Sequence, residues 1–306
     1  MRHVPVLLKE TIELLNLAPG MNVVDGTLGD GGHAAAMLEK IAPTGRLLGL
    51  DADLESLLSA KQFLYPFGER VICVRDNFIN LADIVVLEKF GPVQAILLDL
   101  GWSSPQFAER GRGFSFQIDE QLDMRYDWTS DHGLQTTATA AEMLNNYTEP
   151  ELEKIFREYG EEKLSKEVAR AIVLARKQTP VARTSQLAEI ILAVYRQKLK
   201  TKKAVPWVGG LHPATKVFQA LRLAVNDELG ALAKVLPQAV RLLAPGGRLA
   251  VITFHSLEDR IAKHFFKSQA EDNIRLINKK PIVCGREEYE ANPRARSAKL
   301  RIVEKI

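Results

Sequence analysis

Residues 21–33 read Met-Asn-Val-Val-Asp-Gly-Thr-Leu-Gly-Asp-Gly-Gly-His, and this stretch decides the fold. A short β-rich run ends in Asp25, four glycines crowd the next seven residues, and a helix-compatible run follows from His33. Glycines let the backbone adopt positive φ and let a ligand approach closely, and the first N–H groups of the helix point into the loop. The stretch predicts a strand, a ligand-binding glycine loop and a helix. A tight turn without a ligand is the plainer alternative, but it needs fewer glycines.

The glycine spacing from Gly26 is G-x-x-G-x-G-G, which differs from the dinucleotide fingerprint G-x-G-x-x-G. A glycine loop after the first strand is also how many S-adenosylmethionine (SAM) enzymes hold their cofactor. A second apolar run ends in Asp51, about 20 residues beyond the loop, where doubly wound folds place the carboxylate that binds ribose hydroxyls. NAD and SAM both contain this ribose, so Asp51 supports a nucleoside cofactor without choosing one. A helix N-cap is the simpler role for the same residue.

Composition excludes several classes of protein. The 306 residues are 46% hydrophobic and 26% charged with a net charge of +3, which is ordinary for a globular protein. Cys73 and Cys284 are the only cysteines, too few for a disulfide framework or a zinc set. No apolar run reaches membrane-span length, and charges at Lys9, Glu10 and Glu13 interrupt any secretory h-region. We expect a cytoplasmic protein without a membrane partner.

Apolar strands alternate with helices in two parts of the chain, which predicts a parallel sheet covered on both faces. Between them, residues 102–210 contain helical runs and no convincing strand. We therefore expect a doubly wound, Rossmann-like α/β domain made of residues 1–101 and 211–306, with an inserted helical domain at 102–210. Expected strands are 21–25, 46–51, 70–75, 93–99, 248–254 and 299–304, and expected helices are 33–41, 53–63, 79–90, 149–159, 161–177, 184–199, 215–243 and 256–267.

The segment Asp99-Leu-Gly-Trp-Ser-Ser-Pro-Gln-Phe107 follows the fourth expected strand and is the candidate chemical centre. Amino-group methyltransferases carry a short polar-Pro segment beside an aromatic residue at this position. The exocyclic N4 of cytosine is a poor nucleophile, because its lone pair is delocalised into the ring, and acceptors must aim it at the methyl group. Asp99, Ser103 and Ser104 are the candidate acceptors. Trp102 and Phe107 are candidates to stack on a flipped base, and a simple Ser-Pro turn is the alternative.

Other chemistries fit the sequence less well. Methylation at C5 of cytosine requires a cysteine nucleophile, and neither cysteine lies beside the Asp99 segment. His255 stands near Glu258 and Asp259, but no second His or Cys lies at ligand spacing, so we expect no metal. A hydrolytic triad with His255 would lack the G-x-S-x-G elbow. The plainer interpretation of this segment is a helix N-cap at Ser256.

Arginines and lysines are unevenly distributed. Arg112 and Arg125 lie in segments with Gly, Phe and Tyr, a composition typical of nucleic-acid contacts, although Arg–Asp pairs within an ordered loop explain them equally well. Residues 176–203 contain eight Lys or Arg against one acid, and residues 260–306 contain twelve against six. Two basic tracts in a nearly neutral protein favour a phosphate-backbone partner, with solvated surface lysines as the alternative.

Together these segments resemble one family, the bacterial small-subunit ribosomal RNA (cytosine-N4)-methyltransferases, which depend on SAM. The resemblance extends over essentially the whole chain, including the insertion. It rests on HVPVLLKE (3–10), DGTLGDGGH (25–33), DLGWSSPQF (99–107), RGFSF (112–116), LDMRYD (122–127), YGEEKLSKEVARAIV (159–173), HPATKVFQALRLAVNDEL (212–229), FHSLEDRIAK (254–263) and NPRARSAKLR (292–301).

The resemblance implies methyl transfer from SAM to N4 of a cytidine in the decoding region of 16S ribosomal RNA, within the small ribosomal subunit. The insertion would recognise the cytidine and its RNA surroundings. By position, the cofactor-binding residues would be Gly31, Gly32, His33, Asp51, Phe78, Asp99 and Gln106. Substrate-binding candidates are Trp102, Arg112, Arg125 and His255.

The sequence departs from the family pattern near the expected cytosine pocket. Trp102 replaces a small aliphatic residue, Phe107 stands where Leu is usual, and Tyr126 stands where Met is usual. No cofactor position is lost, so the departures bear on substrate detail. Two other functions remain open at this point: a ribosome-assembly or RNA-binding factor without turnover, and a DNA amino-methyltransferase.

Overall fold

The computed structural model describes residues 4–101, 111–126, 138–201, 203, 205, 207, 210–270 and 272–306. The chain forms two compact units. The first, which we call the sheet unit, comprises Met1–Ser103 and Leu229–Ile306. The second, the helical unit, comprises Ser104–Glu228.

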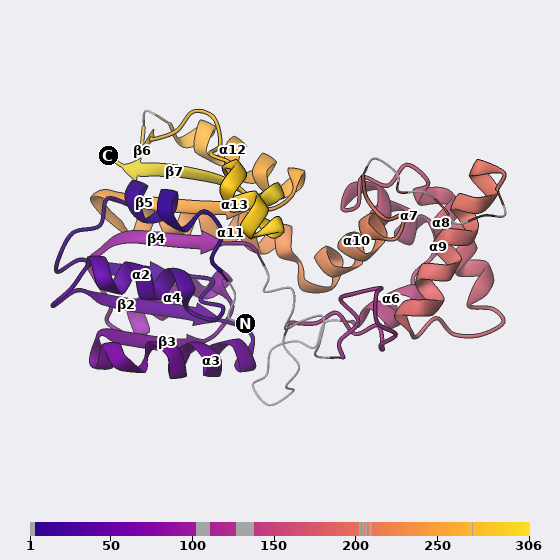
Figure 1. The fold of residues 1–306 in the computed structure, drawn as a ribbon, viewed down its shortest axis with the longest axis horizontal. Helices are drawn as coiled ribbons and strands as arrows, with labels where there is room; N and C mark the ends of the chain where they lie inside the picture. The colour runs from indigo at the N-terminus through magenta and orange to yellow at the C-terminus, as the bar shows by residue number, and fades with distance from the viewer. Residues whose placement is uncertain are drawn as a thin grey trace. The chain divides into compact units, whose positions relative to one another are not determined.

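The sheet unit is built on one seven-stranded sheet in the order β3-β2-β1-β4-β5-β7-β6, which runs from bottom to top of that unit in Figure 1. Strands β1 to β5 are parallel, and β7 is antiparallel to both β5 and β6. The order starts at β1 and extends outward in both directions, which is the doubly wound arrangement. The strands are β1 (Asn22–Asp25), β2 (Arg46–Asp51), β3 (Val71–Arg75), β4 (Val93–Asp99), β5 (Leu243–Thr253), β6 (Ile274–Leu276) and β7 (Lys299–Lys305).

Helices cover both faces of the sheet, because successive strand side chains point to opposite sides. Val23 and Leu97 pack in one hydrophobic cluster, and their neighbours Val24 and Leu98 pack in the other. The first cluster includes side chains of α1 (Leu8–Leu14), α2 (Gly32–Lys40) and α3 (Leu54–Leu64). The second includes side chains of α4 (Leu81–Leu87), α11 (Glu228–Leu242) and α12 (Ser256–Gln269). The expected doubly wound α/β fold is confirmed.

The helical unit packs short amphipathic helices around buried side chains such as Phe156. Thr139 and Thr148 begin the first two helices with capping boxes, in which each threonine and the glutamate three residues later bond each other's backbone N–H. The helices are α6 (Ala140–Asn146), α7 (Glu149–Glu158), α8 (Ser165–Ala175), α9 (Thr184–Leu199) and α10 (Thr215–Asn226). The described residues from 111 to 210 contain no strand, only an isolated bridge between Gln121 and Arg183.

Two expectations differ from the structure at the end of this unit. The single helix expected over 215–243 is wrong, because Asp227 adopts a left-handed conformation (φ 45°) that separates α10 from α11. Residues 211–228, expected in the sheet domain, belong to the helical unit. Among the described residues, no helix combines the length and the apolarity that crossing a membrane requires.

Candidate active site

Three carboxylates end neighbouring parallel strands at one edge of the sheet. Asp25 closes β1, Asp51 closes β2 and Asp99 closes β4. In the register, Asp25 lies opposite Gly49 on β2 and Leu97 on β4. Ligands of doubly wound sheets bind beyond this carboxyl edge, so we take this edge as the candidate site.

The glycine loop between β1 and α2 is shaped by backbone conformation and by one of these acids. Gly31 has φ 81°, a conformation that side-chain-bearing residues avoid, and it precedes the first residue of α2. The Gly29 N–H donates to Asp51 Oδ2 at 2.8 Å. An added Cβ at Gly26 would lie 2.6 Å from the Leu98 side chain. The glycines therefore serve close packing as well as the turn itself.

Asp99 is held from several directions. Its backbone N–H donates to Thr27 Oγ1 at 2.6 Å, which ties β4 to the glycine loop. Its Oδ1 accepts the Gly101 N–H at 3.1 Å. Its Oδ2 lies 3.5 Å from Nδ1 of His33, the buried second residue of α2. The structure thus joins Asp99 and His33, two residues expected in the cofactor site.

Burial governs the protonation of the acids at this edge. Desolvation raises the pKa of Asp25 to about 7, although the Thr27 N–H opposes the rise. Desolvation also raises the pKa of Asp99 to about 8, with the charges of Asp25 and Glu258 adding to the effect. A pocket with two such carboxyls favours a ligand that brings positive charge, since the charge would stabilise the ionised acids.

Asp51 and Phe78 are the residues expected to contact the ribose and the adenine of the cofactor. Asp51 Oδ1 accepts the Asp53 N–H at 2.8 Å, and Asp53 in turn caps α3. Phe78 begins a 3₁₀ turn, η2 (Phe78–Asn80), and its Cβ lies 3.7 Å from where a Gly26 Cβ would stand. Both residues therefore adjoin the glycine loop.

His255 also lies at the carboxyl edge, directly after β5. It caps α12, so the expectation of a cap at Ser256 is wrong by one residue. His255 Nδ1 accepts the Glu258 N–H at 3.4 Å, and buried Glu258 accepts the backbone N–H groups of Phe254 and His255 at 2.7 and 3.2 Å. The capping box gives both side chains a structural role.

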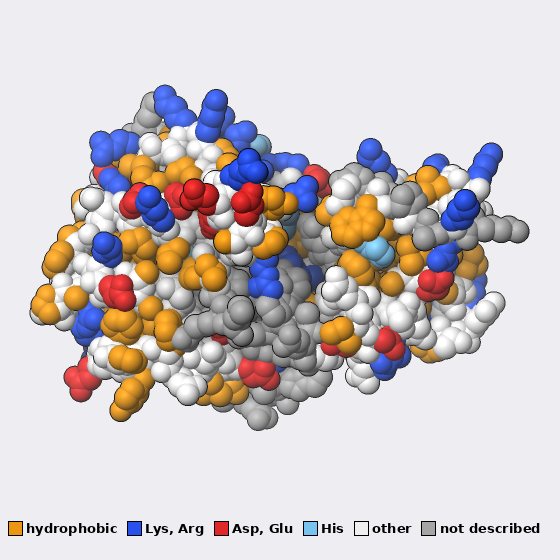
Figure 2. All heavy atoms as spheres, viewed as in Figure 1, with side chains coloured by type: hydrophobic (Ala, Val, Ile, Leu, Met, Phe, Trp, Pro, Cys, Tyr) orange, Lys and Arg blue, Asp and Glu red, His pale blue; other side chains and the backbone are white. Residues whose placement is uncertain are grey.

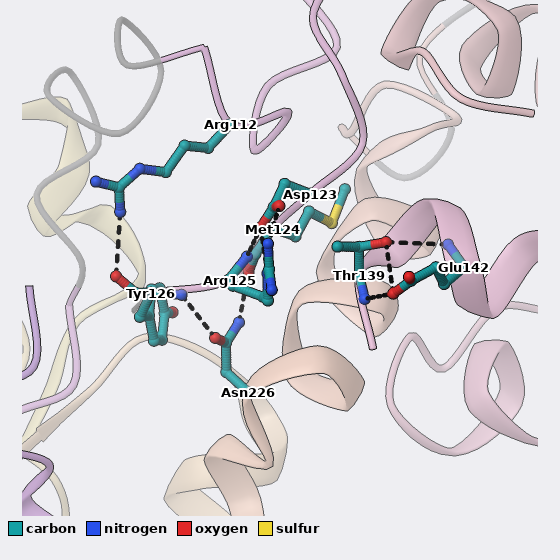
Figure 3. Close-up of polar contacts among 8 residues, drawn as sticks. All are labelled: Arg112, Asp123, Met124, Arg125, Tyr126, Thr139, Glu142 and Asn226. Atoms are coloured by element: carbon teal, nitrogen blue, oxygen red, sulfur yellow. Dashed lines mark hydrogen bonds and ion pairs between the residues drawn. The ribbon is translucent and has the colours of Figure 1, made fainter. Parts of the chain in front are cut away.

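Arg112 and Arg125 lie in the helical unit, where both interact within their own loop (Figure 3). Arg125 forms a two-pronged ion pair with Asp123, with N···O distances of 2.9 and 2.7 Å. Arg112 is buried and donates to the Tyr126 carbonyl at 3.1 Å. The side-chain amide of Asn226 bonds the Met124 carbonyl and the Tyr126 N–H. These arginines were expected either to contact nucleic acid or to stabilise an ordered loop through Arg–Asp pairs. The structure contains such a pair for Arg125.

Some expected site residues lie outside the described part of the chain: Trp102, Ser103, Ser104, Gln106 and Phe107. Conversely, sequence reasoning left Asp25, Thr27 and Glu258 out of the site. The sequence pattern could have indicated Asp25, because Asp25 ends the first strand in the same way that Asp51 and Asp99 end theirs. Thr27 acts through a contact with Asp99, 72 residues away, for which the local pattern has no signal, whereas Glu258 bonds its near neighbours Phe254 and His255.

The residues present fit SAM as a cofactor. Asp25 is buried and the Asp99 side chain is 14% exposed, and among the described residues neither forms an ion pair with Lys or Arg. SAM carries a sulfonium and an ammonium group, so it would supply the positive charge that this edge lacks. Asp51 at the end of β2 offers carboxylate oxygens to a ribose.

The fold and this edge define the class of protein, a SAM-dependent methyltransferase with a doubly wound sheet. The family model of the MraW methylase family matches residues 1–306, and the chain belongs to this family.

A relative from Heliobacterium modesticaldum, named ribosomal RNA small subunit methyltransferase H, is 45% identical, with 99% of this chain and 98% of the relative covered. A relative of the same name from Geotalea daltonii is also 45% identical, with 100% and 99% covered. Among solved structures, an rRNA methylase from Streptococcus thermophilus aligns at a TM-score of 0.45 and 11% identity, covering 100% of this chain and 99% of that one.

Proposed function

We propose that this protein transfers the methyl group of SAM to N4 of a cytidine in the decoding region of 16S ribosomal RNA, within the small ribosomal subunit. The observation that carries the proposal is the largely enclosed Asp99 carboxyl at the carboxyl edge of the sheet, bonded to the glycine loop through Thr27 and facing His33. The names of the 45% identical relatives support the ribosomal RNA substrate.

The chemistry of N4 explains the need for Asp99. When bound, SAM supplies an activated methyl group on its sulfonium. The amine must be held by acceptors that direct its lone pair toward that methyl, and a fixed carboxylate is a strong acceptor of this kind. We assign this role to Asp99, with Ser103 and Ser104 completing the set and Trp102 stacking on the base. Gly31, Gly32, His33, Asp51, Phe78 and Gln106 would hold the cofactor.

The cysteines support an amino product over a C5 product. C5 methylation requires a thiolate that adds to the ring, and burial raises the pKa of both Cys73 and Cys284. A raised pKa keeps the thiol protonated and weakly nucleophilic. Cys73 lies within β3 with its side chain against the first hydrophobic cluster, away from the strand's end.

Exposed lysines of the helical unit support an RNA partner. Arginines of the 176–203 tract have structural partners, since Arg176 donates to the carbonyls of Leu144 and Tyr147 at the end of α6, and Arg183 and Arg196 pair with acids. Figure 2 shows several separate Lys and Arg side chains on the face of the helical unit that it draws, with hydrophobic and acidic side chains between them. Within the described residues, four lysines of the tract are exposed and make no side-chain hydrogen bond or ion pair: Lys177, Lys198, Lys200 and Lys203. These cations are available to phosphates.

The deciding experiment measures methyl transfer from labelled SAM to small subunits that lack this modification. Free 16S ribosomal RNA and duplex DNA serve as parallel substrates, and nucleoside mass spectrometry identifies the product. N4-methylcytidine formed on subunits is the expected result. SAM binding without transfer would support a non-catalytic assembly factor, transfer to duplex DNA would support a DNA amino-methyltransferase, and 5-methylcytidine would contradict the role of Asp99.

A further inference from the structure

An N-terminal arm, residues Val4–Leu7, lies against the start of α2. The Cβ position of Gly32 lies only 2.4 Å from Pro5 Cγ, so the Pro5 ring occupies the space that a side chain at Gly32 would need. Val6 and Leu7 are 2% and 0% exposed. The arm therefore fills the space into which a side chain at position 32 would point. Only the backbone of Gly32 could contact a cofactor.

The arm also fixes the state of the His33 ring. His33 Nε2 lies 3.1 Å from the Val6 carbonyl oxygen. A carbonyl can only accept, so Nε2 must carry the hydrogen. In the neutral ring, Nδ1 then presents its lone pair toward Asp99 Oδ2, 3.5 Å away. The neutral Nδ1 can therefore accept a hydrogen bond from a protonated Asp99 carboxyl, which favours the protonated form of Asp99.

The arm itself is held by the C-terminal part of the chain. The Leu7 N–H donates to Glu288 Oε1 at 2.6 Å, from helix α13 (Arg286–Ala291). Asn292 Nδ2 donates to the Val4 carbonyl at 3.1 Å. Leu7 adopts a left-handed conformation with φ 52° and ψ 33°, which a leucine disfavours and which surrounding contacts must maintain.

We propose that Glu288 is a positioning residue of the methyl-transfer site, because its bond to Leu7 keeps the Val6 carbonyl on His33 and so keeps His33 Nδ1 directed at Asp99. The inference deepens the proposed function and rests on it. Glu288 touches neither Asp99 nor the glycine loop in any contact of the described residues; it acts through the arm.

The consequence for pH dependence follows from the groups that face Asp99. These are Asp25 from β1, Glu258 from α12, His33 from α2 and the Gly101 N–H. Burial is the largest cause of the raised Asp99 pKa, about 8. A loosened arm admits water beside His33, which lowers the Asp99 pKa toward its ordinary value. Since an ionised Asp99 accepts the amine, the acid limb of the rate profile should move to lower pH.

The test compares Glu288→Ala, Glu288→Gln and the matched control Glu287→Ala in the full chain. Glu287 is the exposed neighbour on the same helix. Three quantities are measured for each: the Kd for SAM by calorimetry, the pH profile of kcat/KM on small subunits, and the Tm.

Glu288→Ala should weaken SAM binding about tenfold, because the arm that packs against the start of α2 loses its anchor, and should move the acid limb down by about one pH unit. Glu288→Gln should stay within about twofold of wild type, because its amide oxygen accepts the same N–H. If Glu288→Ala lowers the Tm but leaves the Kd for SAM and the pH profile unchanged, the arm has only a structural role and the proposal is overturned. If the wild type binds SAM without methyl transfer, the proposed function fails, and the Kd comparison still decides the role of Glu288.

Discussion

Asp51 Oδ2 accepts the Gly29 N–H at 2.8 Å, so the acid expected to bind the ribose also shapes the glycine loop. Its other oxygen accepts the Asp53 N–H at 2.8 Å. Asp51 thus has a structural role in the loop beside the ribose-binding role that we propose for it.

Replacing Asp51 separates these two roles. Asp51→Ala should weaken SAM binding by about 10- to 100-fold, because both the loop anchor and the ribose acceptor are lost. Asp51→Asn retains one oxygen and should lose less. Calorimetric titration with SAM measures the effect, and the Tm of each variant reports on the loop alone. A Tm loss with unchanged SAM affinity would leave Asp51 with only the structural role.

The buried Asp25 makes stability depend on pH in a defined direction. Its pKa is about 7 in the folded protein, against an ordinary value of 3.8. Between these values the folded state binds more protons than the unfolded state, so the free energy of unfolding falls as pH rises. The contribution is fully present below about pH 4 and is lost as pH rises through about 7.

Asp25→Asn should remove this contribution, since an amide oxygen can still accept the Thr27 N–H that Asp25 accepts at 3.1 Å. Relative to wild type, the variant should gain about 2–3 kcal/mol between about pH 5 and pH 8, from two pH units at about 1.4 kcal/mol each. Urea denaturation at several pH values measures the difference. A constant difference across this range would show that Asp25 ionises normally in the folded state.

Because Gly32 and Pro5 are in contact, substitutions at these two positions should have non-additive effects on the free energy of unfolding. Gly32→Ala places a methyl 2.4 Å from Pro5 Cγ and should destabilise the protein by about 1–3 kcal/mol through overpacking. Pro5→Gly removes the obstructing ring, so the double variant should recover part of this loss. A double-mutant cycle by urea denaturation measures the coupling, and additive effects would mean that the arm and α2 do not press on each other.

The sequence predicted the fold of the sheet unit well, because its strands are continuous apolar runs that end at acids. Runs such as 46–51 and 93–99 coincide with β2 and β4. It did not predict β6, whose three residues are too few for a periodic pattern. It also joined α10 to α11, because Asp227 takes its left-handed conformation without a glycine or proline to mark it.

The site was predictable only where a residue stands at the end of a strand or in the glycine loop. His33 and Asp99 are 66 residues apart, yet each was expected at the cofactor site, and the structure brings them within 3.5 Å. The arm was not predictable, because Leu7 and Glu288 are 281 residues apart and neither carries a motif for their contact. Such long-range contacts come from tertiary packing and leave no local signal.

Salt dependence provides the last prediction, on the RNA partner. Each lysine that contacts a phosphate releases counterions on binding, and its loss lowers the slope of log K against log salt by about 0.7 to 0.9. A triple variant, Lys177→Gln, Lys198→Gln and Lys203→Gln, should therefore reduce the slope by about two units and weaken binding to small subunits at low salt. The SAM affinity should be unchanged, since these lysines belong to the helical unit and the glycine loop to the sheet unit.

The matched control replaces three exposed lysines of the sheet unit, Lys40, Lys61 and Lys89, and should leave the slope unchanged. Equal slopes for the two triple variants would mean that the helical unit's lysines are merely solvated, and that RNA is bound by another surface.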